Sequence, residues 1–361
     1  MSLLLEKEEI MNSIKNKKVV LSYSKIHNYI NSVFCLNKKI IQFIKEDSVT
    51  GFEKDATIGI GSESSGIMKG QGTNPTLWAI GHFCYFYEYH CFKYLIPNYK
   101  FVIDDGDLYD SFITSREYRF SYRPHTKKQI LGYLDYIEEK LFNILYNIEL
   151  NETNTYLILL GILHNHMHCE SLLFTKKLLG YNSTFTMHLS LDKKFNFEFI
   201  EVKGGTFTQG TYEGENLIAF DNEMPNFPVK VKDFKVSKYC VTEKMLLKFL
   251  LTGGYRNKKL WSDNGWRWVS ENQIDKPFYW IFDDDTYLIK DHENTRPISD
   301  VLPACHINYY EAEAICKYFG GRLPLESEWE YIATNGGTTK FPWGNEMISN
   351  CGNLNYSGNI T

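Results

Sequence analysis

Residues 156–170 read YLILLGILHNHMHCE, an apolar run that passes directly into a stretch with three histidines. The apolar run, closed by a glycine at Gly180, predicts one helix over about 154–179. Positions four apart lie on the same face of a helix, so His164 and His168 can bind one metal ion together. Imidazole suits zinc, iron, copper and nickel, so the pair alone does not choose the metal.

The residue after His164 excludes one common use of such a pair. A helical metalloprotease needs a glutamate directly after the first histidine as its general base, and this chain has Asn165 there. The plain alternative to a metal site is two histidines that happen to lie four apart, on the surface or in the core.

A third histidine lies in a second expected helix, over 74–95. Asn74 is a candidate N-cap, and Pro75 suits the first helical position. His82 then lies two turns into the helix among apolar and aromatic residues, where a lone histidine is more often a core residue. Beside the paired histidines of another helix, however, it becomes a natural third ligand. Three protein ligands leave open positions on the ion, as a catalytic metal requires.

The remaining pattern predicts two domains. Helical spacing within residues 1–50, and again from His125 past Leu145, adds two helices to those above and predicts a four-helix bundle over 1–190. A boundary is expected near 183–194. Residues 191–361 show an alternating strand, many Gly, Trp and Pro residues and short helices, which predicts an α+β domain with long loops. Its helices are expected at 242–251, 310–319 and 326–333.

Composition excludes several classes of protein. The formal net charge of −5 implies no nucleic-acid partner, and no apolar run reaches the ~18 residues that a membrane span requires. The eight cysteines lack metal-type CxxC spacing, and the first residues do not resemble a signal peptide. We therefore expect a cytoplasmic protein with free thiols and no membrane partner.

Two sets of motifs, in the same order, resemble a known enzyme family. W-x-x-G-H-x-x-x-F-x-E around His82 and H-x-x-x-H-x-E from His164 to Glu170 resemble the DinB-like domain of the non-heme iron sulfoxide synthases of ergothioneine, ovothiol and selenoneine biosynthesis. FDNEMP at 220–225 and GRLPLESEWE at 321–330 resemble the formylglycine-generating-enzyme-like, or sulfatase-modifying-factor, domain that this family fuses to its bundle.

The resemblance implies a fold and a reaction. The fold is an α plus α+β arrangement, with a DinB-like four-helix bundle followed by the first part of a formylglycine-generating-enzyme-like (C-type-lectin-like) domain. The reaction is Fe(II)- and O2-dependent formation of a C–S bond between hercynine or histidine and a cysteine-type thiol.

The family's site residues transfer to particular positions of this chain. Its iron ligands correspond to His82, His164 and His168. Glu170 is expected to orient an imidazole N–H, with a surface carboxylate as the alternative. Arginines in the loop before the third helix hold the substrate carboxylate in the family, which suggests Arg116 and Arg119 here, with solvated loop charge as the alternative.

The chain departs from the family at its end. It stops at Thr361, whereas in relatives a later segment carries the acid/base tyrosine and most substrate-binding residues, so catalytic residues are expected beyond this point. A fragment, a chain completed by a separate polypeptide and a non-catalytic metal-binding pseudoenzyme all remain open. So do C–Se bond formation of the selenoneine type and metal-dependent thiol transfer on the bundle alone.

Overall fold

The computed structural model falls into two compact units. The first holds the described residues up to Leu178 together with 211–212 and 218–225, and the second holds 197–210 and those from Asn226 onward. Gly180 and the boundary expected at 183–194 lie outside the described residues. The structure describes residues 21–42, 74–103, 106–115, 118–119, 125–178, 197–212, 218–291, 294–346, 348 and 351.

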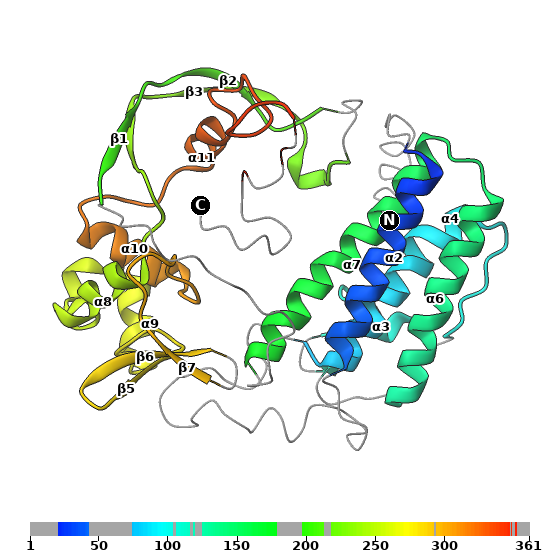
Figure 1. Ribbon diagram of the computed structural model, residues 1–361, viewed down its shortest axis with the longest axis horizontal. Helices are drawn as coiled ribbons and strands as arrows, with labels where there is room; N and C mark the ends of the chain where they lie inside the picture. Colours follow the sequence, from blue (N-terminus) through cyan, green and yellow to red (C-terminus); the bar gives the residue numbers. More distant parts are fainter. Residues whose placement is uncertain are drawn as a thin grey trace. The chain divides into compact units, whose positions relative to one another are not determined.

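Long helices that lie side by side make up the first unit (Figure 1). They are α2 (Tyr23–Ile41), α3 (Thr76–Phe86), α6 (Lys127–Asn147) and α7 (Glu152–Leu178). Helices α2 and α3 each contact both α6 and α7, so the four enclose one apolar core. The helical character predicted for the N-terminal half is confirmed, and its assignment as DinB-like stays a prediction.

Local signals explain where these helices begin. Thr126 caps α6 by accepting a hydrogen bond from the Gln129 N–H, while the Gln129 side chain accepts one from the Thr126 N–H. The start of α3 differs from the expectation. Pro75 is itself the N-cap and Asn74 does not cap the helix, because the Asn74 side-chain oxygen accepts a hydrogen bond from Arg119 instead.

The helical run that begins with α3 continues past Phe86. It continues through a π-helical turn, Tyr87–Phe92, into α4 (Lys93–Leu95), so the helical run covers the predicted 74–95 closely. The π-turn contains a fully buried carboxylate, Glu88. Single π-turns within α-helices occur often at functional sites.

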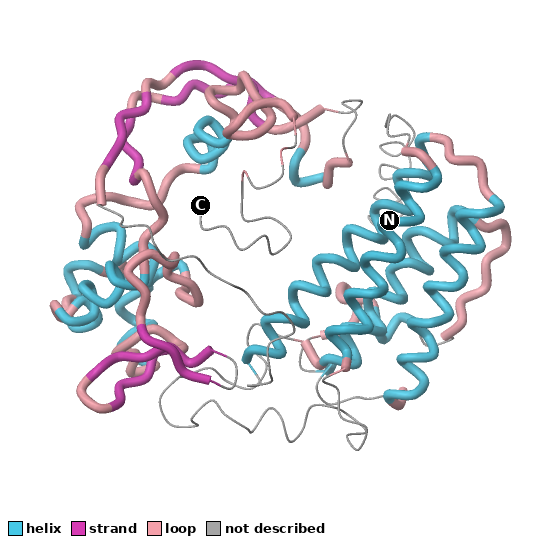
Figure 2. The backbone as a smooth tube through the Cα atoms, in the orientation of Figure 1, coloured by secondary structure: helices cyan, strands magenta, loops and turns pink. Residues whose placement is uncertain are grey.

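Short antiparallel strands and short helices form the second unit, which holds all the described strands (Figure 2). β1 (Phe199–Val202) pairs with β4 (Phe234–Ser237), β2 (Gly205–Gln209) pairs with β3 (Phe227–Val231), and β5 (Trp280–Asp283), β6 (Thr286–Asp291) and β7 (Asn294–Pro297) form one sheet in that order.

Helices α8 (Glu243–Leu251), α9 (Asp263–Glu271) and α10 (Tyr309–Tyr318) share a second apolar core with β5 and β6. A two-point ion pair supports this core, because the Arg296 guanidinium donates to both carboxylate oxygens of the buried Glu243, at 2.6 and 2.9 Å. The helices expected at 242–251, 310–319 and 326–333 are present, the last as α11 (Glu326–Ala333), whereas α9 was not expected.

Part of the connection between β2 and β3 belongs with the first unit. It contains a short 3-10 turn, Asp221–Glu223, and an apolar residue, Ile218, that packs against Tyr156 and Leu157 of α7. The helical unit therefore includes a segment distant from it in the sequence. None of the described helices combines the length and apolarity needed to cross a membrane.

Candidate metal centre

Three imidazoles meet inside the helical unit. His82 comes from α3, and His164 and His168 lie one turn apart on α7. One potential ligand nitrogen from each of the three lies within 4.8 Å of the others. These are the residues expected from the sequence to bind a metal, and that role stays a prediction. Among the described residues, these three are the group of His, Cys, Asp or Glu side chains whose ligand atoms lie close enough together to hold one metal ion.

The spacing of the paired nitrogens suits a shared ion. The Nε2 atoms of His164 and His168 lie 3.3 Å apart. Two nitrogens that each lie about 2.1 Å from one ion are separated by roughly 3.0 to 3.4 Å, depending on the coordination geometry. The residues present therefore fit a bound transition-metal ion.

All three imidazoles are neutral near pH 7, which leaves lone pairs available for a metal. Burial, followed by the nearby His168 and His82, lowers the pKa of His164 to about 2. Burial and the neighbouring His82 lower the pKa of His168 to about 3. Burial also lowers the pKa of His82, against the opposing effect of its hydrogen bond to the Tyr109 backbone.

His82 is oriented by the backbone of a loop. Its Nδ1 lies 2.6 Å from the carbonyl oxygen of Tyr109, and because a carbonyl only accepts, Nδ1 must carry the proton. In the neutral imidazole the other nitrogen, Nε2, is then unprotonated and is the nitrogen with a lone pair available for a metal. The Trp78 indole stacks on the same imidazole, with centroids 4.9 Å apart and planes 9° apart. Neither contact has a signal in the sequence.

Aromatic rings also enclose the pair on α7. Phe86 stacks on His164 with ring centroids 3.6 Å apart. The ring centroids of Phe83 and His168 lie 6.0 Å apart. On the opposite side of the motif, the buried Asn165 accepts a hydrogen bond from Asn37 of α2 at 3.0 Å. Asn165, which takes the place of the protease glutamate, thus holds α7 against α2 and fixes the rotation of the helix that carries both histidines.

Arg119 lies close to the candidate metal centre, but its guanidinium makes hydrogen bonds to nearby backbone carbonyls and to one side chain. Its guanidinium donates to the carbonyls of Thr114 and Ser111 and to the Asn74 side chain, at 2.8 to 3.0 Å, and lies 4.1 Å from the Trp78 ring centroid. Binding of a substrate carboxylate by Arg119 stays a prediction. Arg116 lies outside the described residues.

Glu170 is exposed on α7 and makes no hydrogen bond with the three imidazoles among the described contacts. Its proposed role in orienting an imidazole stays a prediction. For His82 the structure shows that a backbone carbonyl takes this role. A backbone group leaves no signal in the sequence, since every residue carries one.

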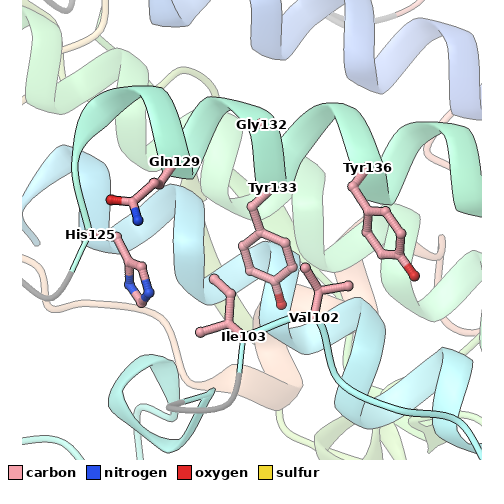
Figure 3. Close-up of a pocket in the computed structure, with 7 residues that line it drawn as sticks. All are labelled: Val102, Ile103, His125, Gln129, Gly132, Tyr133 and Tyr136. Carbon is pink, nitrogen blue, oxygen red and sulfur yellow. The ribbon is translucent and has the colours of Figure 1, made fainter.

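A cavity of about 450 Å³ lies elsewhere in the helical unit (Figure 3). Tyr133 on its wall donates to the buried Glu88, which also accepts hydrogen bonds from the Tyr99 hydroxyl at 2.5 Å and the Val102 N–H at 2.9 Å. The cavity is lined by Val102, Ile103, His125, Gln129, Gly132, Tyr133 and Tyr136.

Comparisons with known proteins match the C-terminal part of the chain to a known domain family. Residues 189–358 match the sulfatase-modifying factor enzyme 1-like domain. A hercynine oxygenase from Mycolicibacterium thermoresistibile is 34% identical over 142 residues, which is 38% of this chain and 31% of that protein. One from Mycobacterium tuberculosis is 31% identical over 144 residues, 39% of this chain and 33% of that protein.

The comparisons confirm the resemblance to the ergothioneine-type sulfoxide synthase family. They match the chain to only about a third of the length of these hercynine oxygenases. A formylglycine-generating enzyme from Thermomonospora curvata is 27% identical over 164 residues, 41% of this chain and 52% of that protein. The three histidines lie outside the region matched to the sulfatase-modifying-factor family, so that match does not bear on them.

Proposed function

We propose that this chain belongs to a sulfoxide synthase that uses Fe(II) and O2 to join a histidine derivative to a cysteine-type thiol. The observation that carries the proposal is the meeting of three neutral, largely buried imidazoles from two helices. The similarity to hercynine oxygenases supports hercynine as the histidine derivative. Three protein ligands leave positions for small molecules on the metal.

The three histidines would hold the ion. His82, His164 and His168 would each bind through one ring nitrogen, and bound Fe(II) would supply the activation of O2. A neutral three-histidine site leaves the positive charge of the ion uncompensated by the protein. It therefore favours an anionic ligand at an open position, and a cysteine thiolate satisfies that requirement.

The remaining residues of the site would orient the ligands and keep water out. The Tyr109 carbonyl fixes the tautomer of His82, and the Trp78 and Phe86 rings cover the faces of two imidazoles. Rings packed against the ligands exclude water and hold each imidazole plane at a fixed angle. The site is thus organised before a metal arrives, which lowers the cost of binding it.

Two measurements test the proposal in sequence. First, the cobalt-loaded chain is titrated with hercynine under anaerobic conditions and followed by its visible spectrum, with histidine for comparison. Then the iron-loaded chain is exposed to O2 with hercynine and cysteine, and mass spectrometry searches for the joined sulfoxide.

We expect hercynine to change the cobalt spectrum only when the histidines are present, and any sulfoxide that forms to depend on the same histidines. The His164→Ala/His168→Ala variant is the negative control for both steps. A chain that binds metal through these histidines but shows neither a hercynine response nor product would instead be a non-catalytic metal-binding protein.

A further inference from the structure

Tyr109 connects the candidate metal centre to a distant side chain. Its backbone carbonyl accepts the hydrogen bond from His82 Nδ1, at 2.6 Å. Its phenol oxygen lies 2.9 Å from Nδ1 of His125, just before α6. One residue therefore contacts a proposed ligand through its backbone and a second histidine through its side chain.

Close packing fixes the Tyr109 ring between these two contacts. The ring lies against Gly81, the neighbour of His82, so closely that a Cβ atom on Gly81 would come within 2.2 Å of a ring carbon. The Tyr109 side chain is almost fully buried, with 2% of its surface exposed. The ring has no room to shift toward α3. Its position therefore constrains that of the backbone carbonyl of Tyr109 itself.

The loop that carries Tyr109 is bound to α3 at two successive carbonyls. Trp78 Nε1–H donates to the Leu108 carbonyl at 2.8 Å, and His82, one turn further along α3, donates to the next carbonyl. Within the loop, the Thr114 hydroxyl donates to the Asp107 carbonyl at 3.1 Å. The loop is therefore a stiff support, and among the described residues the bond between Tyr109 and His125 is one of its anchors outside α3.

The outer end of this connection reaches a cavity. His125 is one of the residues that line it, beside Gln129 and the tyrosines of α6 (Figure 3). A change at His125 can thus be made at the cavity wall, without altering any residue in contact with the three histidines of the metal centre.

We propose that Tyr109 is a positioning residue for His82 and that His125 locks it in place. The proposal rests on the metal-binding role assigned above to His82. The Tyr109 carbonyl holds the proton on Nδ1 and aims Nε2 at the ion, and the His125–Tyr109 hydrogen bond keeps the carbonyl at the required distance. Losing a partner of this kind typically lowers metal affinity about 10- to 100-fold.

Cobalt binding tests the proposal without relying on catalysis. The 361-residue chain and its variants are titrated with Co(II) in competition with a chelator, and the visible ligand-field spectrum reports the geometry around the ion. We expect Tyr109→Phe and His125→Ala to weaken Co(II) binding about 10-fold and to shift the spectrum, because His82 is then less well oriented.

Conservative and matched variants separate positioning from general stability. An asparagine amide can occupy the place of histidine Nδ1, so His125→Asn should restore affinity and spectrum, whereas His125→Gln, which mimics Nε2, should not. Tyr133→Phe is the matched control, since it also removes a buried phenol hydrogen bond, the one to Glu88. It should lower the melting temperature but leave the cobalt spectrum unchanged.

The outcomes distinguish this proposal from the proposed function. If Tyr109→Phe and His125→Ala bind Co(II) like the parent chain, with its spectrum, the positioning role is wrong although the metal centre stands. If the parent chain binds no Co(II) through the three histidines, both proposals fail together.

Discussion

At the scale of single residues, two glycines in neighbouring helices have opposite surroundings. A Cβ atom on Gly81 of α3 would lie 2.2 Å from the Tyr109 ring, whereas nothing lies within 4 Å of a Cβ atom on Gly132 of α6. The first glycine permits close packing next to the metal centre. The second only weakens its helix, because glycine loses more backbone entropy than alanine on folding.

Alanine substitutions should therefore change stability in opposite directions. Gly132→Ala should raise the free energy of unfolding by about 0.5–1 kcal/mol. Gly81→Ala should lower it by about 1–3 kcal/mol through overpacking and should also weaken metal binding, because the ring must move. Urea denaturation of the metal-free proteins measures the change in the free energy of unfolding. Cobalt titration measures the change in metal affinity. Equal effects of the two substitutions would contradict the described packing around Tyr109.

The residue scale also shows where prediction from sequence stops. The spacing of His164 and His168 is sufficient to place both side chains at one point, because helix periodicity is regular. The Tyr109 carbonyl that orients His82 could not be predicted, since any backbone can accept a hydrogen bond. The prediction that Asn74 caps α3 was wrong for a related reason. A side chain that can cap a helix can equally accept a hydrogen bond from a distant arginine.

At the scale of elements, α7 carries two largely buried histidines whose pKa values lie far below the ordinary value. The unfolded chain takes up protons near pH 6.5, while His164 and His168 in the folded chain stay neutral until about pH 2 and 3. The unfolded state thus binds more protons throughout the window below pH 6.5, so the folded state loses stability as the pH falls.

We predict that the metal-free chain becomes less stable between pH 6.5 and pH 4. Each of the two histidines should contribute up to about 1.4 kcal/mol per pH unit. Urea denaturation at several pH values measures this slope. The His164→Gln/His168→Gln variant, which removes both titrating groups, should have a shallower slope. An identical slope would show that the two imidazoles are not buried in the neutral form.

The unexpected helix α9 shows why some elements escape sequence analysis. Asn264-Gly265 is a dipeptide typical of turns, and it lies within the first turn of this helix. Two other signals outweigh it. The Ser262 hydroxyl accepts a hydrogen bond from the Gly265 N–H as an N-cap, and Val269 packs into the second core together with Trp266 and Trp268. Tertiary burial of this kind is not visible in a short stretch of sequence.

At the scale of the whole molecule, a cut of the chain at 190 would not follow the packing. The helical unit also includes residues 211–212 and 218–225, which come later in the chain. Ile218 of this segment covers apolar side chains of the helices, among them Tyr156 and Leu157 of α7. A fragment of residues 1–190 would lack that cover, and the exposed apolar surface would favour association between copies.

Ile218→Asp in the 361-residue chain should therefore destabilise the helical unit by about 1–3 kcal/mol, because a carboxylate would replace the apolar contact. Ile200→Asp is the control, since Ile200 is already 43% exposed on β1. Hydrogen exchange in α7, read by mass spectrometry, should increase only in the first variant. Unchanged exchange in α7 would mean that the segment containing Ile218 does not stabilise the helices.

The central claim, that three histidines from two helices form one metal centre, is tested most directly by metal content. Each protein is loaded anaerobically with Fe(II), freed of unbound metal and analysed for iron per chain. We predict about one iron for the parent chain and for His166→Ala, whose imidazole lies on the same helix outside the cluster, and little iron for His164→Ala/His168→Ala. Undiminished iron in the double variant would contradict the account.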